Sequence, residues 1–316
     1  MGNDGRDCGI HNRQAGSEHR ERADSVSLDA WWEQGRQLRV RVDADRDHQI
    51  FVRDGGDGPP LLLLHGFPAS SYEWASMWTS LTGQHRVIAP DFLGFGASDK
   101  PRGHRYKVTE QADLIQELLA RLNVSKPAVF CYDYGAIVTQ ELQARGYPLG
   151  HVTFSNAGVF PELYRPRPVQ RLAVAPVVGP LLGIAAANLP TFTRTWGEVF
   201  SSEHPLQPDV AAEHFRAARS GAPGRTLQSR LLAYIPERAA MARRLEDALA
   251  ANIHRSSFLW GLQDPVSGQA IAGELRRRFP EADLVTYPDV GHCPHLEVPN
   301  RVAGDLLART TSSGMT

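Results

Sequence analysis

The sequence predicts an α/β fold with a mostly parallel central sheet, flanking helices and one inserted helical segment. Short runs that are apolar throughout recur along the chain and end in turns rich in Gly, Pro or Asp, as buried parallel strands do. Segments with helical spacing separate these runs, and this alternation is typical of parallel sheets. It is interrupted between residues 158 and 236, where short helical patterns rich in Pro and Ala predict an inserted helical cap.

Each element is predicted from its own pattern. Residues 1–27 are polar, so we expect a disordered tail. Residues 38–53 alternate apolar and polar side chains, which favours an antiparallel pair of strands. Buried strands are expected at 60–64, 86–89, 127–130, 152–154, 257–260 and 284–286, and helices at 109–122, 136–143 and 299–309. The sheet domain is therefore expected at 28–157 and 237–316, on either side of the cap.

Composition excludes several classes of protein. The chain has 316 residues, of which 42% are hydrophobic and 22% charged, so it is long and apolar enough to form a sizeable core. A net charge of −1 gives no electrostatic reason to expect nucleic acid or an anionic membrane as partner. The three scattered cysteines fit neither a disulfide framework nor a zinc site. No N-terminal apolar stretch resembles a signal peptide, and Pro and Gly interrupt the apolar run 172–189, so we expect a cytoplasmic protein and no membrane span.

Residues 131–135, Cys-Tyr-Asp-Tyr-Gly, are the most informative segment. They lie between a predicted strand and a predicted helix, as the tight turn of a nucleophile elbow does. Small residues are needed two positions before and after the apex, and Cys131 and Gly135 fill those positions. The apex residue, and hence the predicted nucleophile, is Asp133.

The partners of an elbow nucleophile follow in the expected chain order, first an acid and then a histidine. Asp264 comes directly after the predicted strand 257–260, and His292 comes after the predicted strand 284–286. Functional side chains of open α/β sheets lie past the carboxyl ends of the strands. We therefore predict a catalytic triad of Asp133, His292 and Asp264.

The segment His65-Gly66-Phe67-Pro68 follows the first buried strand. The backbone N–H groups of Phe67 and Tyr134 are predicted to form an oxyanion hole. His65 is predicted to line the substrate site beside this turn.

A carboxylate nucleophile restricts the chemistry. It is ionised at neutral pH, so Asp133 is able to displace a leaving group at an sp³ carbon and form an alkyl ester. His292 would then activate water against that ester. We expect a small hydrophobic organic substrate and water as reactants, with neither a metal nor an organic cofactor. A non-catalytic binding protein with the same fold is the alternative from another class, and a homodimer is left open.

These motifs resemble the α/β-hydrolase superfamily, in its Asp-nucleophile branch of epoxide hydrolases and haloalkane dehalogenases, and in particular the mesoderm-specific transcript homologues. The resemblance extends over roughly residues 50–310 and is patchy across the cap. It implies the α/β-hydrolase fold with an inserted helical cap. The segments that carry it are His65–Trp74, Asp91–Pro101, Asp133–Leu142, Ser155–Glu162 and Asp264–Pro265.

The resemblance also separates two activities. Dehalogenases commonly place Trp after the nucleophile and Asn after His-Gly, whereas this chain has Tyr134 and Phe67, so the resemblance favours an epoxide hydrolase. It implies that Tyr234 and Tyr164 of the cap donate to the epoxide oxygen. Asn156 occupies a position where some relatives carry the triad acid; an amide is unable to replace that acid, and we expect Asn156 to line the pocket.

Overall fold

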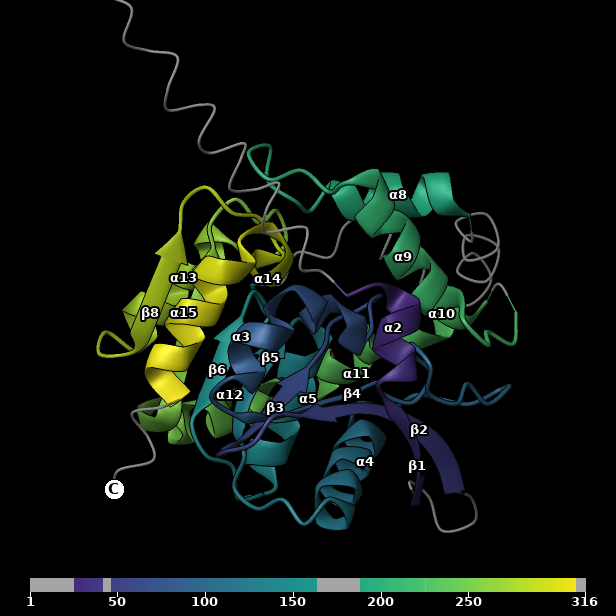
Figure 1. Ribbon diagram of the computed structural model, residues 1–316. Helices are drawn as coiled ribbons and strands as arrows, with labels where there is room; N and C mark the ends of the chain where they lie inside the picture. The colour runs from purple at the N-terminus through teal and green to yellow at the C-terminus, as the bar shows by residue number, and fades with distance from the viewer. Residues whose placement is uncertain (1–25, 42–46, 164–187, 225, 311–316) are drawn as a thin grey trace, which may run out of the picture.

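The computed structural model describes residues 26–41, 47–163, 188–224 and 226–310 (Figure 1). Its centre is an eight-stranded sheet with the order β1-β2-β4-β3-β5-β6-β7-β8. β1 pairs antiparallel with β2, β2 pairs antiparallel with β4, and the remaining pairs are parallel. The strands are β1 (Arg36–Arg41), β2 (Asp47–Gly55), β3 (Pro60–Leu64), β4 (Arg86–Pro90), β5 (Ala128–Tyr132), β6 (Val152–Ser155), β7 (Ser256–Gly261) and β8 (Asp283–Tyr287). The predicted mostly parallel sheet is confirmed.

The central strands are apolar throughout because both faces of the sheet are covered. Leu62 and Leu64 of β3 belong to one hydrophobic cluster, while Leu61 and Leu63 belong to a second cluster on the opposite face. All four side chains are fully buried. Successive side chains of a strand point to opposite faces, so an uninterrupted apolar run is what a strand between two helix layers requires.

Helices form a layer on each face. The first cluster includes side chains from α4 (Val108–Arg121), α5 (Tyr134–Ala144), α12 (Ala242–Ala251) and α13 (Gln269–Arg278). The second includes side chains from α2 (Leu28–Glu33), η1 (Ser71–Met77), α3 (Trp78–Thr82) and α15 (Pro299–Thr310). Two short helices, η2 (Ile253–Arg255) and α14 (Pro294–Glu297), precede β7 and α15.

The described residues between β6 and α12 form α8 (Leu189–Gly197), α9 (Pro208–Arg219), α10 (Leu227–Leu231) and α11 (Tyr234–Ala240). Figure 1 shows α8 and α9 together at one end of the sheet domain. Two hydrogen bonds link this segment to His292 and to the helix α14 that follows it: the His292 N–H donates to Val199 O at 2.8 Å, and the Ser201 N–H donates to Glu297 Oε2 at 3.0 Å. The segment therefore packs directly beside a predicted catalytic residue.

Some sequence predictions fall on residues 1–25 and 164–187, which lie outside the described residues. They include most of the predicted tail and nearly all of the apolar run 172–189. Among the residues that the structure describes, none of the helices has the length and apolar character needed to cross a membrane.

Candidate active site

The turn between β5 and α5 has the strained geometry of an elbow. Asp133 has φ 44° and ψ −109°, a conformation that costs a non-glycine residue about 1–3 kcal/mol. A side chain at Gly135 is excluded, because its Cβ would lie 2.2 Å from the carbonyl oxygen of Leu64. The backbone at the start of α5 thus packs directly on the end of β3, and Asp133 stands at the turn between β5 and α5.

A second close approach brings the loop after β3 to the elbow. A Cβ on Gly66 would lie 2.4 Å from the ring of Tyr132 and 3.0 Å from Cβ of Asp133. Glycine alone fits this gap. The next residue, Phe67, donates its backbone N–H to Oδ1 of Asp133 at 2.9 Å. Tyr134, the other predicted oxyanion-hole residue, is the first residue of α5, where helix N–H groups and the helix dipole favour negative charge.

The structure brings the three predicted triad residues together. Nε2 of His292 lies 3.6 Å from Oδ2 of Asp133, and Nδ1 of His292 lies 2.7 Å from Oδ2 of Asp264. Their side chains are 14%, 8% and 0% exposed in the order Asp133, His292 and Asp264. The imidazole thus bridges an accessible carboxylate and a buried one, as a base between a nucleophile and an orienting acid does.

Asp264 is held by a dense set of donors. Its Oδ2 accepts hydrogen bonds from Ser267 and from Asn156, the latter at 2.8 Å, and its Oδ1 accepts the Val266 N–H at 2.7 Å. Asn156 also exchanges two hydrogen bonds with the backbone of Gly261, at 2.9 and 2.7 Å. The structure thus places the fully buried Asn156 against Asp264, where it orients the acid; the sequence analysis expected it to line the pocket.

Charge and burial oppose each other at this cluster. Burial alone would lower the pKa of His292, but the negative charges of Asp264 and Asp133 and their hydrogen bonds raise it to about 10. Burial alone would raise the pKa of Asp264, but the His292 charge and the donors around the carboxylate hold that pKa below its usual value. In the resting protein the cluster therefore favours an imidazolium between two carboxylates.

His65 does not occupy the substrate-lining position that the sequence analysis predicted. Its Nε2 accepts the Phe92 N–H at 3.1 Å, and its Nδ1 lies 2.9 Å from Gly66 O, so Nδ1 carries the proton and donates. The ring is fully buried and packs against Phe92 and Phe95. Both ring nitrogens bind backbone, so His65 ties the loop after β3 to the loop after β4.

Aromatic side chains surround the elbow. The ring of Tyr234, at the start of α11, lies 5.1 Å from the ring of Tyr134 and 6.3 Å from the ring of Phe67, measured between centroids. Tyr234 is only 2% exposed. The structure therefore places Tyr234 beside Phe67 and Tyr134, the two predicted oxyanion-hole residues. Tyr164, the other predicted cap tyrosine, lies outside the described residues.

Two buried residues beneath the site, Glu73 and His295, were missed by the sequence analysis. Glu73 accepts the Gly66 N–H, and the rings of His295 and Tyr132 pack edge to face with centroids 4.5 Å apart. Glu73 lies within the segment His65–Trp74 and His295 lies three residues after His292, but a titratable residue in a short helical turn gives no local sign that it is buried.

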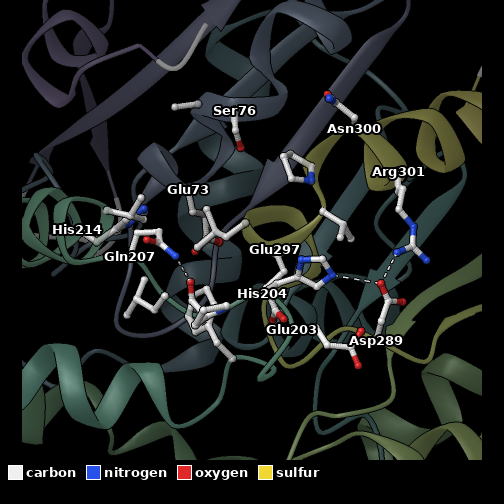
Figure 2. A pocket seen from close by; sticks show the side chains of 18 of the residues that line it. Glu73, Ser76, Glu203, His204, Gln207, His214, Asp289, Glu297, Asn300 and Arg301 are labelled. Carbon is white, nitrogen blue, oxygen red and sulfur yellow. Dashed lines mark hydrogen bonds and ion pairs between the residues drawn. The ribbon is translucent and has the colours of Figure 1, made fainter. Parts of the chain in front are cut away.

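A separate cavity of about 520 Å³ lies between η1, α9 and the start of α15. Figure 2 shows side chains from all three regions lining it, and none of the triad residues is among them. At one end Glu203, His204 and Asp289 are close enough to share a cation. Asp289 already forms an ion pair with Arg301 at 2.6 Å, and its Oδ2 lies 3.1 Å from Nε2 of His204.

Fold and site together define an α/β-fold hydrolase. The family described as alpha/beta hydrolase fold matches residues 59–299, and the chain belongs to that family. The putative hydrolase LipZ of Mycobacterium tuberculosis is 37% identical, over 90% of this chain and 98% of its own length. The human mesoderm-specific transcript homolog protein is 36% identical, over 79% of each chain.

Solved structures agree on the fold. The haloalkane dehalogenase DatA from Agrobacterium tumefaciens superimposes with a TM-score of 0.72 over 89% of this chain and 98% of its own, at 20% identity. At that identity the likeness concerns the fold. The predicted family resemblance is confirmed, and the protein is a hydrolase of this family with relatives among the mesoderm-specific transcript proteins.

Proposed function

We propose that the protein is an epoxide hydrolase-type enzyme that uses Asp133 as a covalent nucleophile. One observation carries the proposal: the two oxygens of the Asp133 carboxylate have different partners. Oδ1 accepts the Phe67 N–H, whereas Oδ2 faces the imidazole of His292. With these different partners, Oδ2 is placed to attack the substrate and Oδ1 is placed in the oxyanion hole.

In the first step Oδ2 attacks an sp³ carbon of the substrate, and the carbon–oxygen bond of the epoxide breaks. The product is an ester of Asp133 with Oδ1 as its carbonyl oxygen. The alkoxide formed by ring opening stays attached to the neighbouring carbon and needs a proton, and the phenol of Tyr234, close to the elbow, is the candidate donor. In the second step water attacks the ester carbonyl carbon, and the Phe67 N–H stabilises the charge that develops on Oδ1.

The change of charge at Asp133 explains how His292 becomes a base. In the resting protein the carboxylates of Asp264 and Asp133 raise the pKa of His292 to about 10. Ester formation removes the negative charge of Asp133, which lowers the pKa of His292 and allows its proton to leave. The neutral imidazole then takes a proton from the attacking water, while Asp264 holds Nδ1.

A haloalkane dehalogenase is the alternative, because the same ester forms when halide leaves. This alternative lacks side-chain donors for the leaving halide, because the side chains of Phe67 and Tyr134 offer no indole or amide N–H. The ring of Tyr134 is fully buried against Phe92, Phe95 and Tyr234. The phenol of Tyr234 instead suits a basic alkoxide, which needs a proton.

Product analysis tests the proposal. The purified protein is incubated in parallel with styrene oxide-type epoxides and with bromoalkanes, and diol and bromide are measured. We expect diol formation that Asp133→Asn abolishes and Asp113→Asn retains, since Asp113 is an exposed acid that pairs with Arg145. Abundant bromide without diol would establish the alternative. Turnover that survives Asp133→Asn would refute both, and inactivity towards every sp³ electrophile would favour the binding protein.

A further inference from the structure

Glu73 lies directly beneath the loop that carries the Phe67 donor. Its side chain is fully buried, and its Oε1 accepts the backbone N–H of Gly66 at 2.9 Å. Gly66 precedes Phe67, whose own N–H donates to Oδ1 of Asp133 at 2.9 Å. The Glu73 carboxyl thus fixes the peptide that immediately precedes the oxyanion-hole donor.

The other oxygen of Glu73 faces a histidine. Oε2 lies 3.6 Å from Nε2 of His295, and both side chains are fully buried. Among the described residues, neither Oε2 nor either ring nitrogen of His295 has a hydrogen-bond partner. His295 belongs to α14 and comes three residues after His292. The pair therefore connects the loop of the oxyanion hole with the loop of the catalytic base.

The surroundings determine where the proton of this pair resides. Burial, with a smaller contribution from Asp133, raises the pKa of Glu73 to about 8, although His65, the Gly66 N–H and His292 oppose the shift. Burial and the His292 charge lower the pKa of His295 to about 3. Both shifts favour a protonated Glu73 beside a neutral His295. The titratable groups around Glu73 include His65, Tyr132, Asp133, His292, Cys293 and His295, and Glu73 also lines the 520 Å³ cavity together with His214 and Glu297.

We propose that Glu73, as a neutral acid, is a positioning residue that fixes the Phe67 N–H against Asp133. Oε1 accepts the Gly66 N–H, and Oε2, the oxygen that would carry the proton, faces Nε2 of His295 at 3.6 Å. This inference rests on the proposed function, because the Phe67 N–H stabilises the oxyanion formed during ester hydrolysis. Loss of the Glu73 proton would place a second negative charge close to that oxyanion, so hydrolysis slows as pH rises above about 8.

Two variants separate this role from packing. Glu73→Gln keeps an acceptor for the Gly66 N–H and a donor towards His295, so it imitates the neutral acid at every pH. Glu73→Met fills a similar volume without either group. In single-turnover experiments, we expect Glu73→Met to slow ester hydrolysis about tenfold or more while ester formation changes little. Glu73→Gln should restore hydrolysis and lack the decline above pH 8.

A direct titration makes the pair testable without substrate. In protein labelled with ¹³C at the Glu carboxyl carbons, the signal absent from Glu73→Gln should titrate well above the ordinary range for glutamate. A signal already ionised at pH 6 overturns the inference, as does unchanged hydrolysis in folded Glu73→Met or a Glu73→Gln as slow as Glu73→Met. Absence of any alkyl ester in the wild type would refute the proposed function instead, and the titration would still decide the state of the pair.

Discussion

The side-chain amide of Asn156 donates a 2.8 Å hydrogen bond to Oδ2 of Asp264, the oxygen that also binds Nδ1 of His292 at 2.7 Å. Asn156 stands at the end of β6 and Asp264 follows β7, so one amide orients the acid and joins the ends of two neighbouring strands. Asn156, which stands at an alternative acid position, therefore supports Asp264, the predicted triad acid.

Replacement of Asn156 with Ala should lower both stability and turnover. Asn156→Ala leaves the Gly261 backbone groups and one lone pair of Asp264 unpaired, which should cost about 1–3 kcal/mol of unfolding free energy. A reoriented His292 should lower kcat by about 10–100-fold. Denaturant unfolding and steady-state kinetics measure the two effects. The control is Ser155→Ala, which loses the bond to Leu259 O without touching Asp264; equal kcat in the two variants would contradict the role of Asn156.

Gly135→Ala should disrupt the elbow. Its Cβ would lie 2.2 Å from Leu64 O, a contact that only a backbone shift relieves, so we expect a loss of about 1–3 kcal/mol and little activity. Gly273→Ala is the matched control, since Gly273 is an exposed residue of α13 with no atom near its Cβ. That variant should be stabilised by up to about 1 kcal/mol. Equal unfolding midpoints for the two variants would show that the close packing is absent.

The charge of His292 predicts how stability depends on pH. Interactions with Asp264 and Asp133 raise its pKa on folding to about 10, so the folded protein binds this proton more tightly than the unfolded chain. The stabilisation is complete below about pH 6.5, the pKa of an unperturbed histidine, and disappears as pH rises through the folded pKa. We expect the difference in unfolding free energy between wild type and His292→Gln to shrink from pH 7 to 10. A constant or growing difference would contradict an imidazolium in the resting site.

Tyr234→Phe should impair the opening of the epoxide. If its phenol protonates the alkoxide that ring opening forms, the rate of ester formation in the variant should fall about 10²–10⁴-fold. Hydrolysis of the ester should change little, because His292 and the Phe67 N–H carry that step. Rapid-quench kinetics separate the two steps. Tyr287→Phe, whose hydroxyl binds Asp305 of α15, should behave as wild type; a Tyr234→Phe variant with normal ester formation would assign proton donation to another group.

Local signals sufficed for the sheet and the elbow. Glycines at 66 and 135 stand where no side chain fits, and the apolar run at β3 shows burial on both faces, so these features were predictable from short segments. The contacts of His65 and Glu73 were not predictable from short segments. A histidine after a strand gives no sign that both ring nitrogens bind backbone, and the Glu73–His295 contact joins residues distant in sequence. The sequence shows that the Asn156 amide is not an acid, but the contact of Asn156 with Asp264 depends on how β6 and β7 pair.

Isotope transfer tests the covalent mechanism most directly. A single turnover of excess wild-type protein with an epoxide in water enriched in ¹⁸O is followed by proteolysis and mass spectrometry of the peptide that contains Asp133. Because Oδ2 leaves with the product and water replaces it, the account predicts one ¹⁸O in the Asp133 carboxylate and none in the diol. A labelled diol with an unlabelled Asp133 would show that water attacks the substrate directly, and would contradict the covalent ester.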